Sequence, residues 1–352
     1  MTAAQRSSTR FGPWRWAICV AALFASAAPG DPGAARVPGV VAPRIALDFD
    51  RETEERILAL SPEKISGLEV QSVLARAPAP RIIDLQGSLA VVTMAPFAEF
   101  LIAMGYPKER VVNPRDGSLS YASFVDSAHL AGTMAWYYEH EGMVPMLIGH
   151  SQGGMMAVRV LHELAGDFGH PLTVWDPLRD EGENRTSIID PFDGSERPVI
   201  GLKVPYAAAI ATGTLPRILL GQWDMVERLH KIPDTVEEFT GYSLEWDPIA
   251  GNFGRAEPYK ATGTAEVRNV VLPPAASHIR LPLAKELALD PVTRAWIDEY
   301  SPARAPVMPV EAGADFSNLL HAADIWYSVK KHWCLEAQHM IRALRKNASA
   351  RQ

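Results

Sequence analysis

The chain contains very little cysteine, with only two such residues among 352. Cys19 lies in an N-terminal stretch that we expect to be removed, so Cys334 remains as the single cysteine of the mature protein. One cysteine cannot form an intrachain disulfide, even in an oxidising compartment. The stability of the fold must therefore come from its core, and roughly 310 residues are enough for one large domain.

The chain also lacks an excess of positive charge. Its 34 lysines and arginines are outnumbered by 41 aspartates and glutamates, which gives a net charge of −7 with neutral histidines. Loss of residues 1–27 would remove three arginines and no acid, leaving 31 basic against 41 acidic residues, a net charge of −10. Phosphate binding needs clustered lysine and arginine. This composition therefore argues against nucleic acid as a partner.

The apolar run near the N-terminus is too short to span a bilayer. Residues 16–28 form an uncharged stretch of 13 residues, whereas a spanning helix needs about 20. Arginines precede this stretch and small residues end it, so residues 1–28 are predicted to be a secretory signal peptide. Residues 29–43, rich in proline and glycine, are predicted to be a flexible linker. We expect a periplasmic or secreted protein without a stable membrane span, with an uncleaved anchor as the alternative.

Segments with strand and helix periodicity alternate in the first half of the chain. Strands are expected at residues 81–87, 110–112 and 144–148, and helices at 97–104, around 124–135 and after residue 152. Such alternation implies crossover connections and a mostly parallel central sheet flanked by helices, which is the α/β class.

The second half of the chain continues this pattern with two interruptions. Residues 169–197 are polar and rich in turn residues, and we interpret them as an excursion from the domain. Residues 213–238 are apolar and largely helical, and we interpret them as a small cap insertion, with a plain crossover helix as the alternative. Further strands are expected at 198–210, 239–246 and 267–272, and a long C-terminal helix at 316–346, within a single domain over 44–352.

The most informative motif follows the strand predicted at 144–148. Gly149, His150, Ser151, Gln152 and Gly153 form a Gly-x-Ser-x-Gly pentapeptide between that strand and an apolar helix. This pattern predicts a nucleophile elbow, a tight turn in which the serine backbone is strained. Glycines are needed on either side because a Cβ there would collide with the neighbouring strand or helix. The serine hydroxyl then lies at a helix N-terminus, where free amides stabilise an oxyanion.

With these residues the chain resembles the α/β-hydrolase superfamily over roughly residues 80–285. The resemblance rests on the pentapeptide around Ser151, on Gln86-Gly87 at a strand end, and on the order of an acid and a histidine downstream. The pentapeptide is common among lipase-like and esterase-like members. The resemblance implies an α/β-hydrolase fold and a triad. In that triad a histidine after the last strand is the base, and an acid after an earlier strand orients it.

His278 is the predicted base, because a loop over 273–277 would deliver it after the strand at 267–272. The alternative is His321, although that residue lies in a helical pattern where a packed or capping histidine is expected. The resemblance assigns to His150 a role in shaping the turn.

Asp247 is the predicted acid, because it follows the strand at 239–246 and precedes His278 by enough residues for one helix and one strand. Asp224 is the alternative, since some lipase-like members place the acid after the preceding strand. Glu245 is a third candidate, at a less suitable position on the strand.

The resemblance also implies an oxyanion hole made by the backbone N–H of Gln152 and one N–H from the loop after the strand at 81–87. Many members have His-Gly at this strand end, whereas this chain has Gln86-Gly87. Both Ser88 and Leu89 therefore stay open as the second donor.

Together these residues predict a serine hydrolase that cleaves a carboxylic ester through an acyl-enzyme on Ser151, without metal or organic cofactor. Met155, Met156 and the apolar segment 213–238 favour a hydrophobic acyl group, so the substrate is expected to be a small-molecule or lipid-like ester. Two alternatives stay open. The same triad could serve an amidase or acyltransferase, or the fold could belong to a binding protein that has lost the base.

Overall fold

The structure is a computed structural model that describes residues 45, 50–89, 91–254, 256–273, 276–304, 307 and 318–350. The predicted signal peptide, residues 1–28, and the predicted linker, residues 29–43, lie outside the described residues. The helices are α1 (Arg51–Leu58), α2 (Gly67–Ser72), α3 (Ala95–Met104), α4 (Ser127–Glu141), α5 (Gln152–Ala165), α6 (Leu215–Leu219), α7 (Trp223–Val226), α8 (Lys285–Leu289), α9 (Pro291–Glu299) and α10 (Leu319–Ala350).

The longer strands are β1 (Ile82–Leu85), β2 (Met146–His150), β7 (Val204–Ile210), β9 (Val236–Ser243) and β13 (Glu266–Val271). Short strands are β3 (Trp175–Asp176), β4 (Glu181–Gly182), β5 (Ser187–Ile189), β6 (Glu196–Pro198), β8 (Lys231–Ile232), β10 (Trp246–Asp247), β11 (Asn252–Phe253) and β12 (Lys260–Ala261). Short 3₁₀ helices are η1 (Pro62–Lys64), η2 (Leu74–Arg76), η3 (Lys108–Arg110) and η4 (His278–Arg280).

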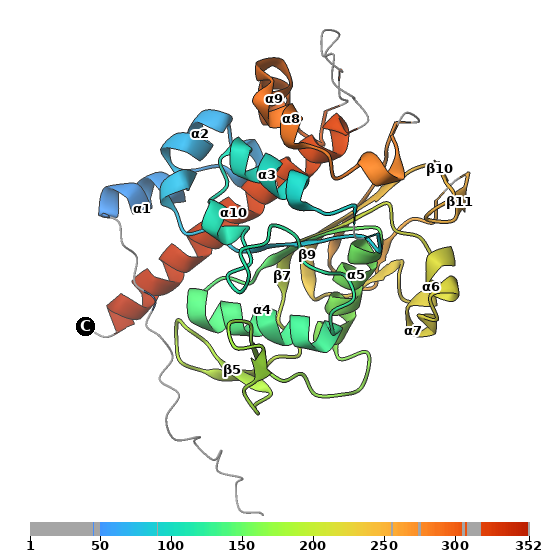
Figure 1. Ribbon diagram of the computed structural model, residues 1–352. Helices are drawn as coiled ribbons and strands as arrows, with labels where there is room; N and C mark the ends of the chain where they lie inside the picture. Colours follow the sequence, from blue (N-terminus) through green and yellow to red (C-terminus); the bar gives the residue numbers. More distant parts are fainter. Residues whose placement is uncertain are drawn as a thin grey trace, which may run out of the picture. The chain divides into compact units, whose positions relative to one another are not determined.

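The longer strands form one five-stranded sheet in the order β1-β2-β7-β9-β13, and each neighbouring pair is parallel. The register places Leu85 beside Gly149 and His150 beside Ile210. Because the strands are parallel, their carboxyl ends meet at one edge, where ligands of open α/β sheets bind. The protein therefore has the predicted α/β architecture, a parallel central sheet flanked by helices (Figure 1).

Helices cover both faces of this sheet because its strands bury side chains on both sides. On β7, Tyr206 and Ala208 belong to one hydrophobic core, while Ala207 and Ala209 belong to the other. The first core contains the apolar residues of α3, α8 and α10, and the second contains those of α4 and α5. This alternation with a period of two residues is the signature of a strand.

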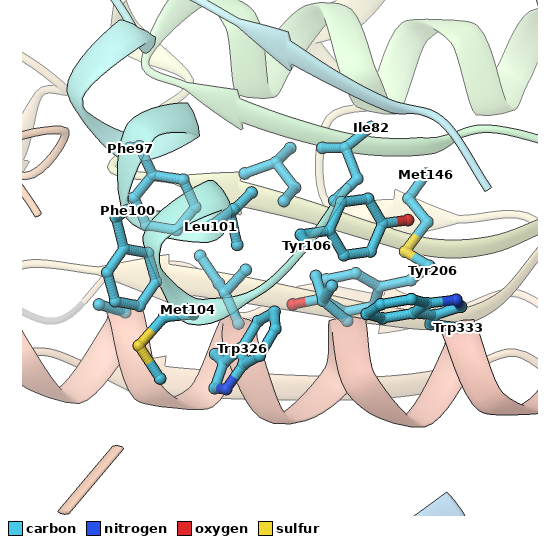
Figure 2. Packing of buried hydrophobic residues seen from close by; sticks show 14 of the residues in the cluster. Ile82, Phe97, Phe100, Leu101, Met104, Tyr106, Met146, Tyr206, Trp326 and Trp333 are labelled. Carbon is cyan, nitrogen blue, oxygen red and sulfur yellow. The ribbon is translucent and has the colours of Figure 1, made fainter. Parts of the chain in front are cut away.

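The long helix α10 is part of the first core. Trp326 and Trp333 on this helix are completely buried, and Tyr106, shortly after α3, packs edge-on against Trp333 with ring centroids 4.9 Å apart (Figure 2). The Tyr106 hydroxyl donates a 2.5 Å hydrogen bond to the carbonyl of Pro80, just before β1. Loss of a buried aromatic ring typically costs about 3–5 kcal/mol. The C-terminal helix is therefore an integral part of the domain.

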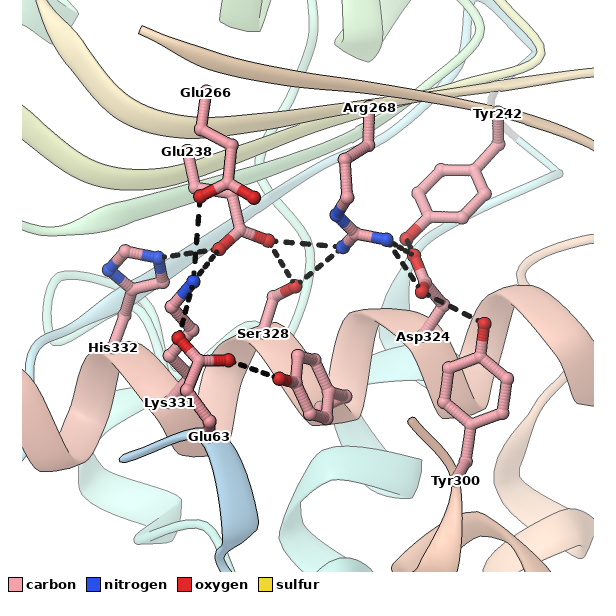
Figure 3. Close-up of polar contacts among 11 residues, drawn as sticks. Glu63, Glu238, Tyr242, Glu266, Arg268, Tyr300, Asp324, Ser328, Lys331 and His332 are labelled. Atoms are coloured by element: carbon pink, nitrogen blue, oxygen red, sulfur yellow. Dashed lines mark hydrogen bonds and ion pairs between the residues drawn. The ribbon is translucent and has the colours of Figure 1, made fainter. Parts of the chain in front are cut away.

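A buried ion network also joins α10 to the sheet (Figure 3). Arg268 on β13 donates to Asp324 on α10 (2.7 Å) and to Glu238 on β9 (3.0 Å). Lys331 and His332 approach Glu238 to 2.9 and 3.1 Å. Burial raises the pKa of Glu238, but the hydrogen bond to His332 and the surrounding positive charges outweigh burial and hold that pKa below its usual range. Glu238 is therefore ionised and paired with the surrounding cations.

The strand predicted at residues 110–112 is wrong. Arg110 ends the 3₁₀ helix η3, and a turn follows in which the N–H of Gly117 donates to the carbonyl of Asn113 (2.9 Å). Val111 is nevertheless buried in the core, which explains its apolar character. Apart from its pairing with β2, β1 makes an isolated bridge between Leu85 and Tyr121 within the described residues.

The two predicted interruptions differ in structure. Residues 169–197 form two small antiparallel pairs outside the central sheet, β3 with β4 and β5 with β6. Strand β6 ends one residue beyond this segment, at Pro198. Residues 213–238 contain α6 and α7, then β8, and β9 already begins at Val236. Their helical part is the connection between β7 and β9.

The predicted C-terminal helix corresponds to α10, which continues to Ala350. Within the described residues, no helix is both long enough and apolar enough to cross a membrane.

Candidate active site

A strained turn connects β2 to α5. Ser151 at this turn has φ 54° and ψ −113°, a conformation that side-chain-bearing residues rarely adopt. Such strain costs about 1–3 kcal/mol and persists only where the surroundings enforce it. At Ser151, hydrogen bonds with β7 and the residues after it hold the strained conformation. The Ser151 N–H donates to the carbonyl of Ile210 (2.7 Å), and the Thr212 hydroxyl donates to the Ser151 carbonyl (2.9 Å).

Glycines on both sides of Ser151 permit a close approach of backbones. A Cβ on Gly149 would collide with the carbonyl of Gly153, and a Cβ on Gly153 would collide with the carbonyl of Leu85 at the end of β1. The start of α5 therefore packs directly across the carboxyl ends of β1 and β2, which places Ser151 at the sheet edge.

The loop after β1 passes beside this turn. A Cβ on Gly87 would lie 3.2 Å from Nδ1 of His150 and 3.4 Å from Cβ of Ser151. Ser88 and Leu89 follow Gly87 directly, and both have exposed side chains. The loop that was predicted to supply an oxyanion donor is therefore adjacent to Ser151, and the amides of Ser88 and Leu89 both stay candidates.

Gln152 flanks Ser151 on the other side as the first residue of α5. The first N–H groups of a helix have no acceptor within the helix, so the Gln152 amide is available to a ligand. The helix dipole places partial positive charge at the same point. Both features suit an oxygen that becomes negatively charged during a reaction.

The structure brings Asp247 and His278 into contact. Nδ1 of His278 lies 2.7 Å from Oδ2 of Asp247, and both side chains are buried. The other Asp247 oxygen accepts the N–H groups of Ile249 and Ala250, each at 3.1 Å. Because a carboxylate oxygen accepts, Nδ1 of His278 is the donor in this contact. In the tautomer of a neutral imidazole that makes this bond, Nε2 carries the lone pair, which is the arrangement a general base needs.

His150 connects the base to the elbow. Its Nε2 lies 2.8 Å from the backbone carbonyl of His278, and the two imidazole centroids are 4.9 Å apart. A carbonyl oxygen only accepts, so Nε2 of His150 is the donor. His150 precedes Ser151 directly, and this bond therefore fastens the His278 loop beside the elbow. No sequence pattern signals this contact beyond the histidine in the pentapeptide.

We expect the burial of His150 to make stability depend on pH. Burial, with a smaller effect from neighbouring His278, lowers the pKa of His150 to about 3, whereas an unfolded histidine has a pKa of about 6.5. Because the folded pKa is the lower one, His150 contributes stability that is complete above about pH 6.5 and is lost as the pH falls toward 3.

The matched variant is His150→Gln, which cannot titrate but keeps an amide donor. Between pH 7 and pH 5.5, wild type should lose about 1 kcal/mol more unfolding free energy than the variant. Urea unfolding at the two pH values measures both losses. Equal losses would show that His150 is not held neutral by the fold.

The alternative acids and base lie elsewhere. Asp224 on α7 pairs with Arg159 (2.6 Å), and Glu245 is exposed between β9 and β10. His321 is completely buried on α10, with ring centroids 6.0 Å from Phe97 and 6.2 Å from Tyr242. The geometry favours Asp247 and His278, because their contact is joined to Ser151 through His150.

No group of three or more His, Cys, Asp or Glu side chains in the described part of the chain could hold a metal ion. Comparisons with known protein families, curated proteins and solved structures found no match to this chain. The function is therefore inferred from the fold and the geometry of the site.

Proposed function

We propose that the protein is a serine hydrolase of the α/β-hydrolase type that cleaves a carboxylic ester. The observation that carries the proposal is the buried Asp247–His278 contact, which is tied through His150 to the strained Ser151. A nucleophile on a tight turn, a histidine with a free Nε2 and an acid on its Nδ1 are the three components of a catalytic triad.

The reaction proceeds in two halves. Oγ of Ser151 attacks the acyl carbon while its proton passes to Nε2 of His278. The tetrahedral intermediate collapses, and the alcohol leaves with the proton from His278. Water then attacks the acyl-enzyme, His278 accepts a proton from that water, and this proton returns to Ser151 as the carboxylic acid departs. Asp247 stabilises the imidazolium in both halves.

The developing oxyanion is stabilised by backbone N–H groups. Gln152 supplies one from the N-terminus of α5, and either Ser88 or Leu89 supplies the other from the loop after β1. Loss of one such donor typically costs about 3–4 kcal/mol of transition-state stabilisation.

Exposed apolar side chains at the carboxyl edge support an apolar group in the substrate. Trp223 is 65 % exposed after β7, and Trp246 and Phe253, in mutual ring contact after β9, are 68 % and 63 % exposed. The two segments are adjacent, because Gly251 lies against Leu215 at the start of α6. Exposed large apolar side chains on these adjacent segments offer an apolar surface to a ligand. A small-molecule or lipid-like ester with a hydrophobic acyl group fits it.

Hydrolysis of 4-nitrophenyl esters of increasing acyl length tests this function. Wild type should release 4-nitrophenol faster from medium-length or long acyl esters than from the acetate, and Ser151→Ala should lose this activity. Ser195→Ala, in an exposed turn before β6, is the control and should resemble wild type. Folded wild type without esterase activity would contradict the function, whereas a preference for acetate would contradict only the hydrophobic acyl group.

A periplasmic or secreted location is part of this proposal, and the N-terminal sequence pattern supports it. We expect mass spectrometry of the exported protein to find an N-terminus close to residue 28. An intact Met1 in that fraction would contradict cleavage.

A further inference from the structure

A polar cavity follows one side of α5, starting at Gln152. Its volume is about 430 Å³, and it is lined by Gln152, Met156, Arg159 and Glu163. These residues are spaced by three or four positions, so they share one face of the helix. The segment leading into α4, from Ser123 onward, forms the facing wall. Gln152, which lines the cavity, directly follows Ser151 in the chain.

A buried arginine lies behind the end of the cavity nearest Ser151. Arg217 on α6 is 2 % exposed, and its Nη1 donates to Oε1 of Gln152 and to Oε1 of Gln222 (2.5 Å). No carboxylate among the described residues forms an ion pair with this guanidinium, and its Nε has no hydrogen-bond partner there. Burial lowers the pKa of Arg217 to about 10. A buried cation without a counter-charge is costly for a protein to keep.

Arg217 fixes the orientation of both glutamine amides. A guanidinium has only donors, so both amide oxygens must face it and both NH₂ groups must face away. Gln152 and Gln222 both line the cavity. Nε2 of Gln152 is buried without an acceptor in the described structure. An unsatisfied buried donor costs about 1–3 kcal/mol, so this group is prepared for an acceptor that the protein does not supply.

The other charged groups of the cavity have charged or polar partners within the protein. Arg159 pairs with Asp224 (2.6 Å). Glu163 accepts the Ser127 hydroxyl (2.5 Å) and pairs with His170 (3.1 Å). Asp126, at the N-terminus of α4, accepts backbone N–H groups of that helix. Among the residues that line this cavity, the buried donor without an acceptor is therefore Nε2 of Gln152, the residue next to Ser151.

We propose that the ester substrate carries a carboxylate near its scissile bond, and that Gln152 and Gln222, with the charge of Arg217 behind them, bind this group. The inference rests on the proposed hydrolase function and adds a substrate class to it. A carboxylate has two acceptor oxygens for the two NH₂ groups, and its charge compensates the buried guanidinium. A neutral alkyl group offers neither.

Two matched substrate pairs test the proposal, because the carboxylate can lie on either side of the ester. The first pair is monobutyl glutarate and butyl pentanoate, and the second is the butanoyl ester of 4-hydroxybutanoate and butyl butanoate. Within each pair a carboxylate replaces a methyl group. In at least one pair, wild type should favour the carboxylate ester about tenfold or more in kcat/KM, the usual value of one charge-assisted hydrogen bond. Acid release is followed by titration.

The decisive variant is Gln222→Glu, which places a carboxylate of the protein against Arg217. The preference for the carboxylate ester should then fall about tenfold or more, toward equality within the pair. Gln71→Glu adds the same charge on exposed α2 and should keep the wild-type preference. An enzyme that hydrolyses the neutral esters and shows no carboxylate preference in either pair overturns the proposal while the hydrolase function stands.

A binding measurement separates the two proposals further. Calorimetric titration of Ser151→Ala should detect glutarate but not its neutral diamide, and the added Gln222→Glu change should weaken glutarate at least tenfold. Selective glutarate binding by a protein that hydrolyses none of the esters would support the pocket and contradict the hydrolase. Equal binding of the two compounds, or binding of neither, overturns the pocket.

Discussion

Replacement of His278 by alanine should reduce ester hydrolysis by a factor on the order of 10⁴ to 10⁶ in kcat. Without the imidazole of His278, the Ser151 hydroxyl keeps its proton and is a poor nucleophile. KM should change little, because no substrate contact is removed. Steady-state kinetics on a 4-nitrophenyl ester measures the loss, with circular dichroism to confirm that the variant is folded.

Two controls distinguish this base from the alternatives. His339→Ala changes an exposed histidine on α10 and should keep the wild-type rate. Asp247→Asn should lose about 10⁴ in kcat, because the amide favours the wrong tautomer of His278, whereas Asp224→Asn should lose little. A folded His321→Ala without activity, beside an active His278→Ala, would show that the base has been assigned wrongly.

Replacement of Arg268 by alanine should destabilise the protein by about 3–5 kcal/mol. The change removes the cation that Glu238 and Asp324 share (Figure 3). Glu238 keeps Lys331 beside it, whereas the buried Asp324 keeps the hydroxyl donors of Tyr242 and Tyr300 but loses its cation. Uncompensated buried charge is among the largest single-residue effects on folding. Denaturant unfolding at neutral pH measures the loss.

Arg304→Ala is the matched control for this prediction. Arg304 is exposed and its side chain bonds the backbone carbonyl of Glu299 (3.1 Å), so its loss should change stability by less than about 0.5 kcal/mol. A loss of that small size in Arg268→Ala would mean that the network contributes specificity of packing but little stability.

The parts of the site that follow from local sequence were predictable. The strained Ser151 follows from its two flanking glycines, since only a tight turn between a strand and a helix needs both. Asp247 and His278 could be selected because each follows a strand, and the ends of parallel strands share one edge. The alternation of strands and helices likewise predicted the α/β class.

Features that depend on tertiary contacts were not predictable. The bond from His150 to the His278 carbonyl joins residues 128 positions apart, and no pattern signals it. From the sequence, Arg217 is expected to be an ordinary exposed charged residue of a short helix, whereas the structure buries it against Gln152. The segment 110–112 resembles a strand because Val111 is apolar, and apolarity in so short a run does not distinguish a strand from a buried turn.

The most direct test is labelling of the purified protein with a fluorophosphonate, which reacts with activated serines, followed by peptide mass spectrometry. We expect one adduct, on the peptide that contains Ser151, and no labelling of His278→Ala. Folded wild-type protein that stays unlabelled, or an adduct on a different serine, would contradict it.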